Sequence, residues 1–92
     1  MYATVVKVTI AAGQVDAAQQ VLREQIVPRI SQSPGFVKGF WTTAADGTNG
    51  LSLIVWDSQQ SADNGAKMIG ENPMPPGVTF NNVEVREVVA EA

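Results

Sequence analysis

Few residues in this chain have side chains that carry out common catalytic chemistry. The 92-residue sequence contains no cysteine and no histidine, so triads that depend on either residue are excluded. It also has no Walker loop, no Gly-x-Gly-x-x-Gly motif and no serine within Gly-x-Ser-x-Gly. Glu84, Glu87 and Glu91 have the spacing of a solvated strand edge rather than of a metal site. We therefore expect no metal and no cofactor.

The charged candidates are Lys7, near the N-terminus, and Glu84 with Arg86, near the C-terminus. If their segments are antiparallel neighbours, a cross-strand pair between Lys7 and Glu84 is expected. In one interpretation the pair lies in a half-closed cavity, where the pKa of a charged side chain is shifted and the side chain orients a substrate oxygen. The alternative is a salt bridge in a dimer interface that fixes the register.

The aromatic candidates are Trp41 and Trp56. Each has the large flat surface and single donor that suit a pocket for an aromatic ligand, and each would serve equally as a core or interface anchor. By alternation Trp41 shares a face with Gly39, which leaves space beside the indole, whereas Phe36 and Phe40 share the opposite face and are expected in the core.

The hydrophobic pattern predicts six elements. A helix with three- and four-residue apolar spacing spans 14–32, and Pro28 predicts a kink or an early end near Val27. A second helix follows a cap at Asp57 or Ser58. The strands carry β-branched and aromatic residues. The predicted strands are 2–10, 36–43, 51–56 and 78–89, and the second helix is 59–69.

The order strand, helix, strand, strand, helix, strand predicts a single α+β domain over 1–92. This is the ferredoxin-like βαββαβ arrangement, a four-stranded antiparallel sheet with both helices on one face. Alternation places one set of side chains under the helices, namely Val6, Val8, Ile10, Val83, Val85 and Val89. It leaves another set on the uncovered face, namely Val5, Lys7, Thr9, Asn82, Glu84 and Arg86. Ile54 and Trp56 are also expected on the uncovered face, which is then too apolar for water.

The adjoining Asn81 and Asn82 are disfavoured in a strand. They indicate a β-bulge or an exchange with a partner chain, as an alternative to a catalytic amide.

Size and composition point to self-association. A chain of this length buries only about 60–65% of its unfolded surface, and no disulfide can stabilise it. A second copy packed sheet to sheet would cover the uncovered face and enclose a barrel-like interior, so we expect a homodimer.

The net charge is −3 and the six basic residues are scattered. No nucleic-acid partner is therefore expected. The longest apolar run and the N-terminus match neither a membrane span nor a signal peptide, which makes a cytoplasmic protein the default.

Several short motifs add a resemblance over nearly the whole chain. They are the opening strand YATVVKVTI, the Ser33–Phe36 turn SPGF, Gly39 with Trp41, the segment VWDS at 55–58, and Ala62. In these the chain resembles the dimeric α/β-barrel proteins, particularly the antibiotic-biosynthesis-monooxygenase-like group. The resemblance implies a homodimer with a small cavity between each sheet and its helices or partner. Characterised members oxidise polycyclic aromatic molecules without metal or flavin, degrade haem, or isomerise small lactones. Haem-degrading members use a histidine as iron ligand, and this chain has none, so no haem role is expected unless Tyr2 or a methionine takes the place of the histidine.

These inferences lead to one hypothesis with two alternatives. The hypothesis is a homodimeric, cofactor-independent monooxygenase-like protein that acts on a small aromatic molecule. Its pocket would be lined by Trp41, Trp56, Val5, Gly39, Ile54 and Asn82, and its polar groups would be Lys7, Glu84 and Arg86. The alternatives are a non-catalytic dimer for ligand binding or interaction, and a cofactor-free isomerase or cyclase.

Overall fold

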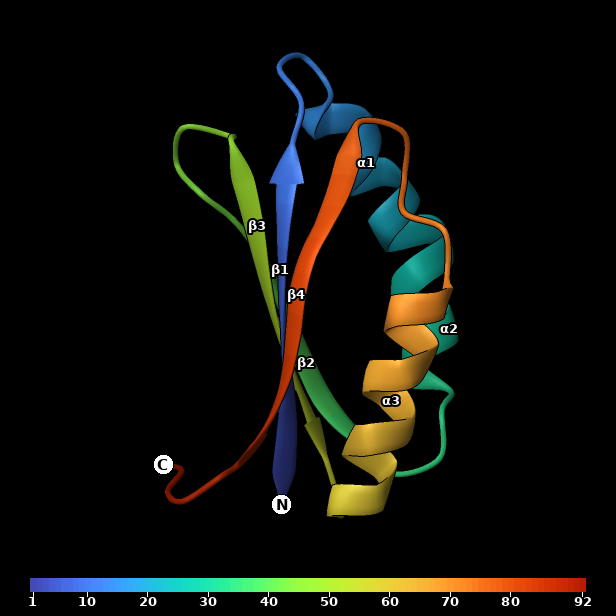
Figure 1. The fold of residues 1–92 in the computed structure, drawn as a ribbon, viewed down its shortest axis with the longest axis vertical. Helices are drawn as coiled ribbons and strands as arrows, with labels where there is room; N and C mark the ends of the chain where they lie inside the picture. The colour runs from blue at the N-terminus through green and yellow to red at the C-terminus, as the bar shows by residue number, and fades with distance from the viewer.

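Four antiparallel strands form one sheet, and the helices cover one face of it (Figure 1). The computed structural model describes all 92 residues. The sheet has the order β2-β3-β1-β4. The elements are β1 (Tyr2–Ile10), α1 (Val15–Val21), η1 (Leu22–Ile26), α2 (Val27–Ser31), β2 (Phe36–Thr43), β3 (Asn49–Trp56), α3 (Gln59–Glu71) and β4 (Val78–Glu87). The predicted α+β ferredoxin-like fold is confirmed. No helix is long and apolar enough to cross a membrane.

The first helical run contains an irregular turn just before Pro28. The run continues from α1 to α2, but η1 between them is a π-helical turn, in which the Val27 N–H bonds to the Leu22 carbonyl. Pro28 has no N–H and cannot continue the regular hydrogen-bond ladder, and a π-turn is one way in which a helix absorbs one extra residue. The predicted disturbance near Val27 is confirmed, and the helix continues to Ser31 instead of ending there.

The core lies between the sheet and the helices. Trp56 is its largest member and only 1% exposed. The indole Nε1 donates a hydrogen bond to the buried Thr4 hydroxyl at 3.2 Å, and the Phe36 ring packs edge-on against the indole, with centroids 6.1 Å apart. Ile54 is equally buried on the same side. The prediction that Ile54 and Trp56 face away from the helices is therefore wrong, because β3 is apolar on both faces and alternation alone cannot say which face is covered.

Two β-bulges change which side chains share a face. The first lies between Phe36 and Lys38 on β2 and leaves Val37 without a partner. Phe36 and Trp41 consequently both face the helices, whereas Phe40 is 56% exposed on the other face. The prediction that Phe36 and Phe40 share a core face is wrong, since one extra residue exchanges the faces of a strand.

The second bulge lies on β4, opposite the Lys7–Val8 step of β1. Lys7 pairs with Asn82 and Val8 with Phe80, so Asn81 is the extra residue, and its side chain accepts a hydrogen bond from the Thr9 hydroxyl at 2.8 Å. The predicted bulge at this asparagine pair is confirmed. Val89, predicted under the helices, lies beyond the end of β4 and is 88% exposed.

We call the face of the sheet that no helix covers the open face. One row of cross-strand neighbours runs over it from Phe40 through Leu53 and Val5 to Glu84. Figure 1 shows the sheet with the helices on only one side. The row is apolar over β2, β3 and β1 and becomes charged at β4, so the apolar part is a contiguous patch.

The predicted pair between Lys7 and Glu84 does not form. The register places Glu84 opposite Val5 and Lys7 opposite Asn82. Glu84 instead makes an ion pair with Arg86 on its own strand at 2.6 Å and accepts a hydrogen bond from Asn82 at 3.2 Å. The hydrogen bond and positive charge of Arg86 hold the pKa of Glu84 below its ordinary value. Glu84 is therefore ionised at neutral pH and is poorly suited to act as an acid.

Candidate ligand cavity

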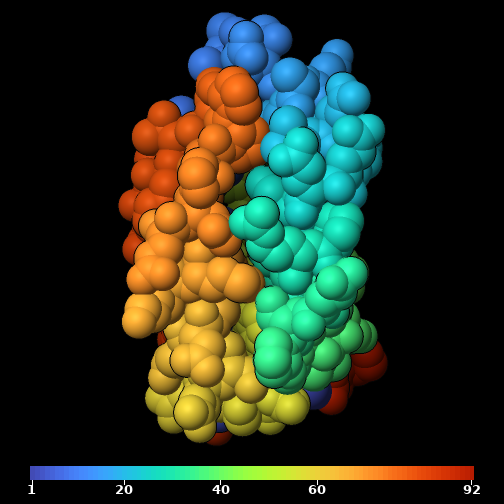
Figure 2. Space-filling view, turned by 90° about the vertical axis from the view of Figure 1, so that its right-hand side faces the viewer, coloured from blue at the N-terminus to red at the C-terminus, as the bar shows by residue number.

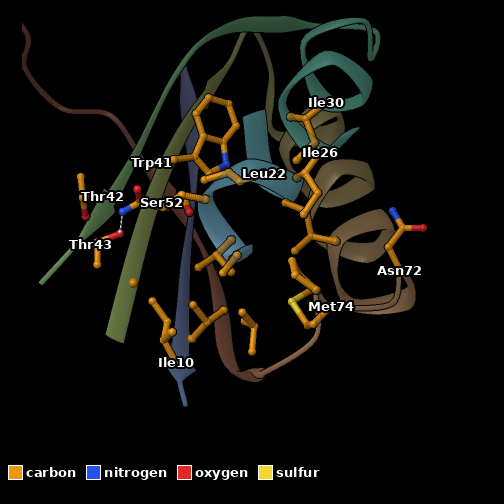
Figure 3. A pocket seen from close by; sticks show the side chains of 18 of the residues that line it. Ile10, Leu22, Ile26, Ile30, Trp41, Thr42, Thr43, Ser52, Asn72 and Met74 are labelled. Atoms are coloured by element: carbon orange, nitrogen blue, oxygen red, sulfur yellow. Dashed lines mark hydrogen bonds between the residues drawn. The ribbon is translucent and has the colours of Figure 1, made fainter. Parts of the chain in front are cut away.

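A cavity of about 130 Å³ lies between the sheet and the helices. Its floor comes from β1, β2 and β3, one wall comes from the first helical run, and the opposite wall comes from the loop between α3 and β4 (Figure 3). The apolar lining residues are Val6, Val8, Ile10, Ala18, Leu22, Ile26, Ile30, Trp41, Ile54, Ile69, Met74 and Val78. Figure 2 shows a hollow between the first helical run and the segment before β4, with part of the sheet visible inside.

The order of side-chain sizes along β3 explains why the space exists at this end of the sheet. The residues of β3 that face the helices are Trp56, Ile54, Ser52 and Gly50, in decreasing size, and the last three line the cavity. Large side chains fill the Trp56 end of the core, whereas the small residues at the Gly50 end leave it open. Ala18 is the small residue facing this region from α1. A void of this kind persists because surrounding side chains collapse into it only partly.

Trp41 forms one boundary of the cavity and depends on Gly39. A Cβ atom at Gly39 would be 2.6 Å from the Trp41 ring, so the indole lies directly against the glycine backbone. In Figure 3 the indole nitrogen is on the side of the ring nearest Leu22. No side chain or carbonyl of the chain accepts a hydrogen bond from Trp41 Nε1, whereas Trp56 Nε1 is bonded to Thr4. Trp41 therefore offers a free donor at the cavity.

The other polar groups of the lining are few. Gln19 Nε2 donates to the Thr43 hydroxyl at 3.3 Å across the cavity rim. Ser52 contributes a hydroxyl and Asn72 an amide, and the exposed Arg29 is also among the lining residues. No carboxylate, lysine, histidine or cysteine lines the cavity, and nowhere in the structure do three potential metal-ligating side chains gather. The site is thus an apolar space with several donors and no obvious general base.

The predicted site residues are divided between the two faces of the sheet. Trp41 and Ile54 line the cavity, and Gly39 supports the Trp41 ring without lining it. Trp56 lies in the adjacent core, and its edge borders a second, separate pocket beside Ser33 and Ser61. The others lie on the open face and cannot touch a ligand in the cavity of their own chain: Val5, Lys7, Asn82, Glu84 and Arg86.

Six polar lining residues were missed by sequence reasoning: Gln19, Arg29, Thr42, Thr43, Ser52 and Asn72. The signal for Ser52 was present in the decreasing sizes along β3, provided that the buried face is first identified from Trp56. Arg29 lies just after the π-turn, where a regular helical wheel assigns the wrong direction. Asn72 follows the end of α3, in a proline-rich loop whose path no periodicity describes.

No protein-family model matches the sequence, and no curated protein matches it either. Solved structures do match. A MhuD variant with two manganese protoporphyrin IX molecules bound per active site is 16% identical, with a TM-score of 0.74, over 100% of this chain and 98% of that one.

Two further matches have similar coverage. A Deinococcus radiodurans protein assigned to the antibiotic biosynthesis monooxygenases is 15% identical, with a TM-score of 0.69, over 100% of this chain and 95% of that one. A dimeric ferredoxin-like protein from an uncultured marine organism is 11% identical, with a TM-score of 0.68, over 100% of this chain and 98% of that one. The predicted resemblance in fold to the antibiotic-biosynthesis-monooxygenase-like proteins is confirmed.

Proposed function

We propose that this chain is a homodimer that binds a small aromatic molecule in the cavity and promotes its oxidation by molecular oxygen without a cofactor. The observation that carries this proposal is the combination of an apolar cavity and the unpartnered Nε1 of Trp41 at its boundary. A ligand oxygen that accepts this hydrogen bond would be fixed relative to the ring, while the apolar walls exclude water. The Deinococcus radiodurans protein of the same fold is assigned to monooxygenases, which supports this choice of reaction class.

In the proposed reaction the substrate supplies the electrons. An electron-rich aromatic molecule, once deprotonated, transfers an electron to O₂. The resulting pair forms a carbon–oxygen bond at a ring C–H, and loss of water from the peroxide leaves a carbonyl, so that a phenol and O₂ become a quinone and H₂O. The contribution of the protein is to position the substrate and to provide a dry environment.

The lining does not fit a haem, although MhuD of the same fold binds manganese protoporphyrin. The chain has no histidine and no cysteine, and Met74 is the one lining side chain of a type that ligates haem iron. A cavity of about 130 Å³ is also far smaller than the sites that hold drug-sized ligands. No step through haem is therefore proposed.

Ligand binding without turnover is the second candidate. It is favoured by one specific observation, the lack of a carboxylate, lysine or histidine in the lining. An isomerase or cyclase would also need such a base, so ligand binding is the stronger of the two alternatives.

The homodimer is proposed from the open face. The apolar row Phe40–Leu53–Val5 would remain in water in a single chain, and a second copy covering it would remove that area from solvent. The dimeric ferredoxin-like protein supports this assembly. Lys7, Glu84 and Arg86 would then lie at or near the interface between copies.

The function is tested with a panel of hydroquinones and small phenols, using tryptophan fluorescence and oxygen uptake. We expect ligands to quench Trp41, and Trp41→Phe to weaken binding about 2- to 10-fold because it removes one hydrogen-bond donor. Trp56→Phe, which leaves Trp41 as the only tryptophan, should retain the quenching. We also expect oxygen uptake above the uncatalysed rate for at least one hydroquinone.

The outcomes separate the candidates. Binding without oxygen uptake would leave only the ligand-binding function. Absence of quenching by every ring compound would contradict both candidates. Circular dichroism of each variant checks that the fold is retained.

A further inference from the structure

Two polar atoms of the cavity lining have no hydrogen-bond partner within the chain, namely the Trp41 Nε1 and the Ser52 hydroxyl. The other hydroxyls beside them are occupied, since that of Thr42 donates to a carbonyl of β3 at 2.6 Å and that of Thr43 accepts from the Gln19 amide at 3.3 Å. Every buried side-chain nitrogen and oxygen of the structure has a partner. Trp41 and Ser52 are half-buried, so their two unpartnered atoms are the ones that a small molecule can still reach.

The sheet brings these two atoms to the same part of the lining. Trp41 on β2 is the direct cross-strand neighbour of Ser52 on β3, and both residues line the cavity. Direct neighbours on one face of a sheet have Cβ atoms about 4.5–5.5 Å apart. In Figure 3 the Ser52 side chain lies next to Trp41 on the sheet side of the cavity. A polar group of a ligand that rests against the Trp41 ring is therefore placed to meet both atoms.

The cavity also limits the size of the ligand. Its volume of about 130 Å³ is close to that of an engineered apolar cavity of about 150 Å³ which holds one benzene molecule. A single ring therefore fills the space between Trp41 on one side and the wall formed by Leu22 and Ile26. A second fused ring would have to displace side chains of the lining.

We propose that Ser52 and Trp41 together hold the oxygen of a single-ring phenol, which makes Ser52 a residue that determines the specificity of the cavity. This inference rests on the proposed function, since it concerns the same site. An indole N–H can only donate a hydrogen bond, whereas a serine hydroxyl both donates and accepts. A phenol hydroxyl also does both, so it accepts from Trp41 and donates to Ser52.

The same two contacts persist when the substrate loses its proton, as the proposed reaction requires. The Ser52 hydroxyl then rotates and donates to the phenolate oxygen, and the indole N–H continues to donate to it. Hydrogen bonds to the charged form of a group favour that form. The pair would thus stabilise the phenolate without a contribution from a charged side chain.

Phenol and toluene test the proposal by isothermal titration, because they have similar sizes and differ in a hydroxyl against a methyl group. A cavity without a polar partner would prefer toluene, since burying an unbonded hydroxyl is costly. We expect the wild-type protein to bind phenol at least as tightly as toluene. Ser52→Ala should shift the ratio of the two Kd values about 3- to 30-fold in favour of toluene. Ser52→Thr keeps the hydroxyl and should restore the ratio to within about 2-fold of the wild-type value, although its extra methyl group weakens the binding of both rings.

Ser31→Ala is the matched control. Ser31 is an exposed residue of α2 that does not line the cavity, and its hydroxyl donates to the Pro28 carbonyl at 3.0 Å. Its loss should leave the ratio unchanged, and circular dichroism checks the fold of each variant. A nuclear magnetic resonance signal gives a second measurement. In the Trp56→Phe background the only indole N–H belongs to Trp41, and its resonance should move more with phenol than with toluene.

The remaining outcomes distinguish this inference from the function on which it rests. Binding of toluene but not of phenol by the wild-type protein would overturn the role of the two polar atoms and leave aromatic binding intact. A ratio that Ser52→Ala does not change, or that Ser31→Ala changes equally, would overturn the role of Ser52. Tighter binding of 1-naphthol than of phenol would overturn the limit to one ring. Failure of all these rings to bind would overturn both the inference and the proposed function.

Discussion

Leu53→Glu is expected to convert the proposed dimer into a folded monomer. Leu53 is at the centre of the apolar row on the open face, with Phe40 beside it on β2 and Val5 on β1. It is 38% exposed in the single chain, so a glutamate there is tolerated by the isolated fold. In a sheet-to-sheet dimer the same carboxylate would be buried without a partner, and each copy would introduce one. Because desolvation of an unpaired charge costs several kcal/mol, we expect dimer affinity to fall by a factor of about 100 or more.

Sedimentation equilibrium and light scattering measure this change, with circular dichroism as a check on folding. Gln60→Glu is the matched control. It adds the same charge in the first turn of α3, on the opposite side of the molecule, and should leave the dimer intact. A parent chain that is monomeric throughout the concentration series, or a Leu53→Glu variant that dimerises normally, would contradict the proposed assembly.

Two glycines of α3 should respond in opposite directions to the same substitution. A Cβ atom at Gly65 would be 2.3 Å from the Trp56 ring, whereas at Gly70 nothing lies within 4 Å. Trp56 cannot move aside easily, because it is 1% exposed, hydrogen-bonded to Thr4 and packed against Phe36. We expect Gly65→Ala to lower the free energy of unfolding by about 1–3 kcal/mol through overpacking. Gly70→Ala should raise it by up to about 1 kcal/mol through helix propensity.

Urea unfolding followed by tryptophan fluorescence measures both effects, at one fixed protein concentration because association of the proposed dimer would contribute to stability. The loss expected for Gly65→Ala is a substantial part of the free energy of unfolding of a typical domain, which is about 5–15 kcal/mol. If both substitutions change the free energy of unfolding in the same direction, the close contact between α3 and Trp56 does not constrain the protein in solution.

The fold was predictable because its signals repeat along each element. The bounds of β1 and β2 match the prediction, and the Ser58 cap of α3 forms as expected, with its hydroxyl accepting from the Ser61 N–H at 3.2 Å. Each of these depends on local residue types and on periods of two or 3.6 residues. Errors at single positions do not change the order of the elements.

The site was less predictable because it depends on which face of each strand is covered. The run LSLIVW in β3 is apolar at nearly every position, so its alternation is consistent with either face. The bulge at Val37 then reverses the relation between Phe36 and Phe40. As a result, Lys7, Glu84 and Arg86 were placed together with Trp41, although the sheet separates them. Arg29 gave no sequence signal, since an isolated arginine near the end of a helix is common.

The irregular turn in η1 and the bulges at Val37 and Asn81 have a shared consequence for aligning this sequence with others. Each adds a single residue inside an element that would otherwise be regular. An ungapped alignment through β2 or β4 would match inward-facing positions with outward-facing ones after the bulge. Through the first helical run it would rotate all later positions by about 100°. Position-by-position transfer of functional residues to this chain therefore needs one-residue gaps at these three places. Arg29 and Trp41 each follow such a gap, and Val78 precedes one.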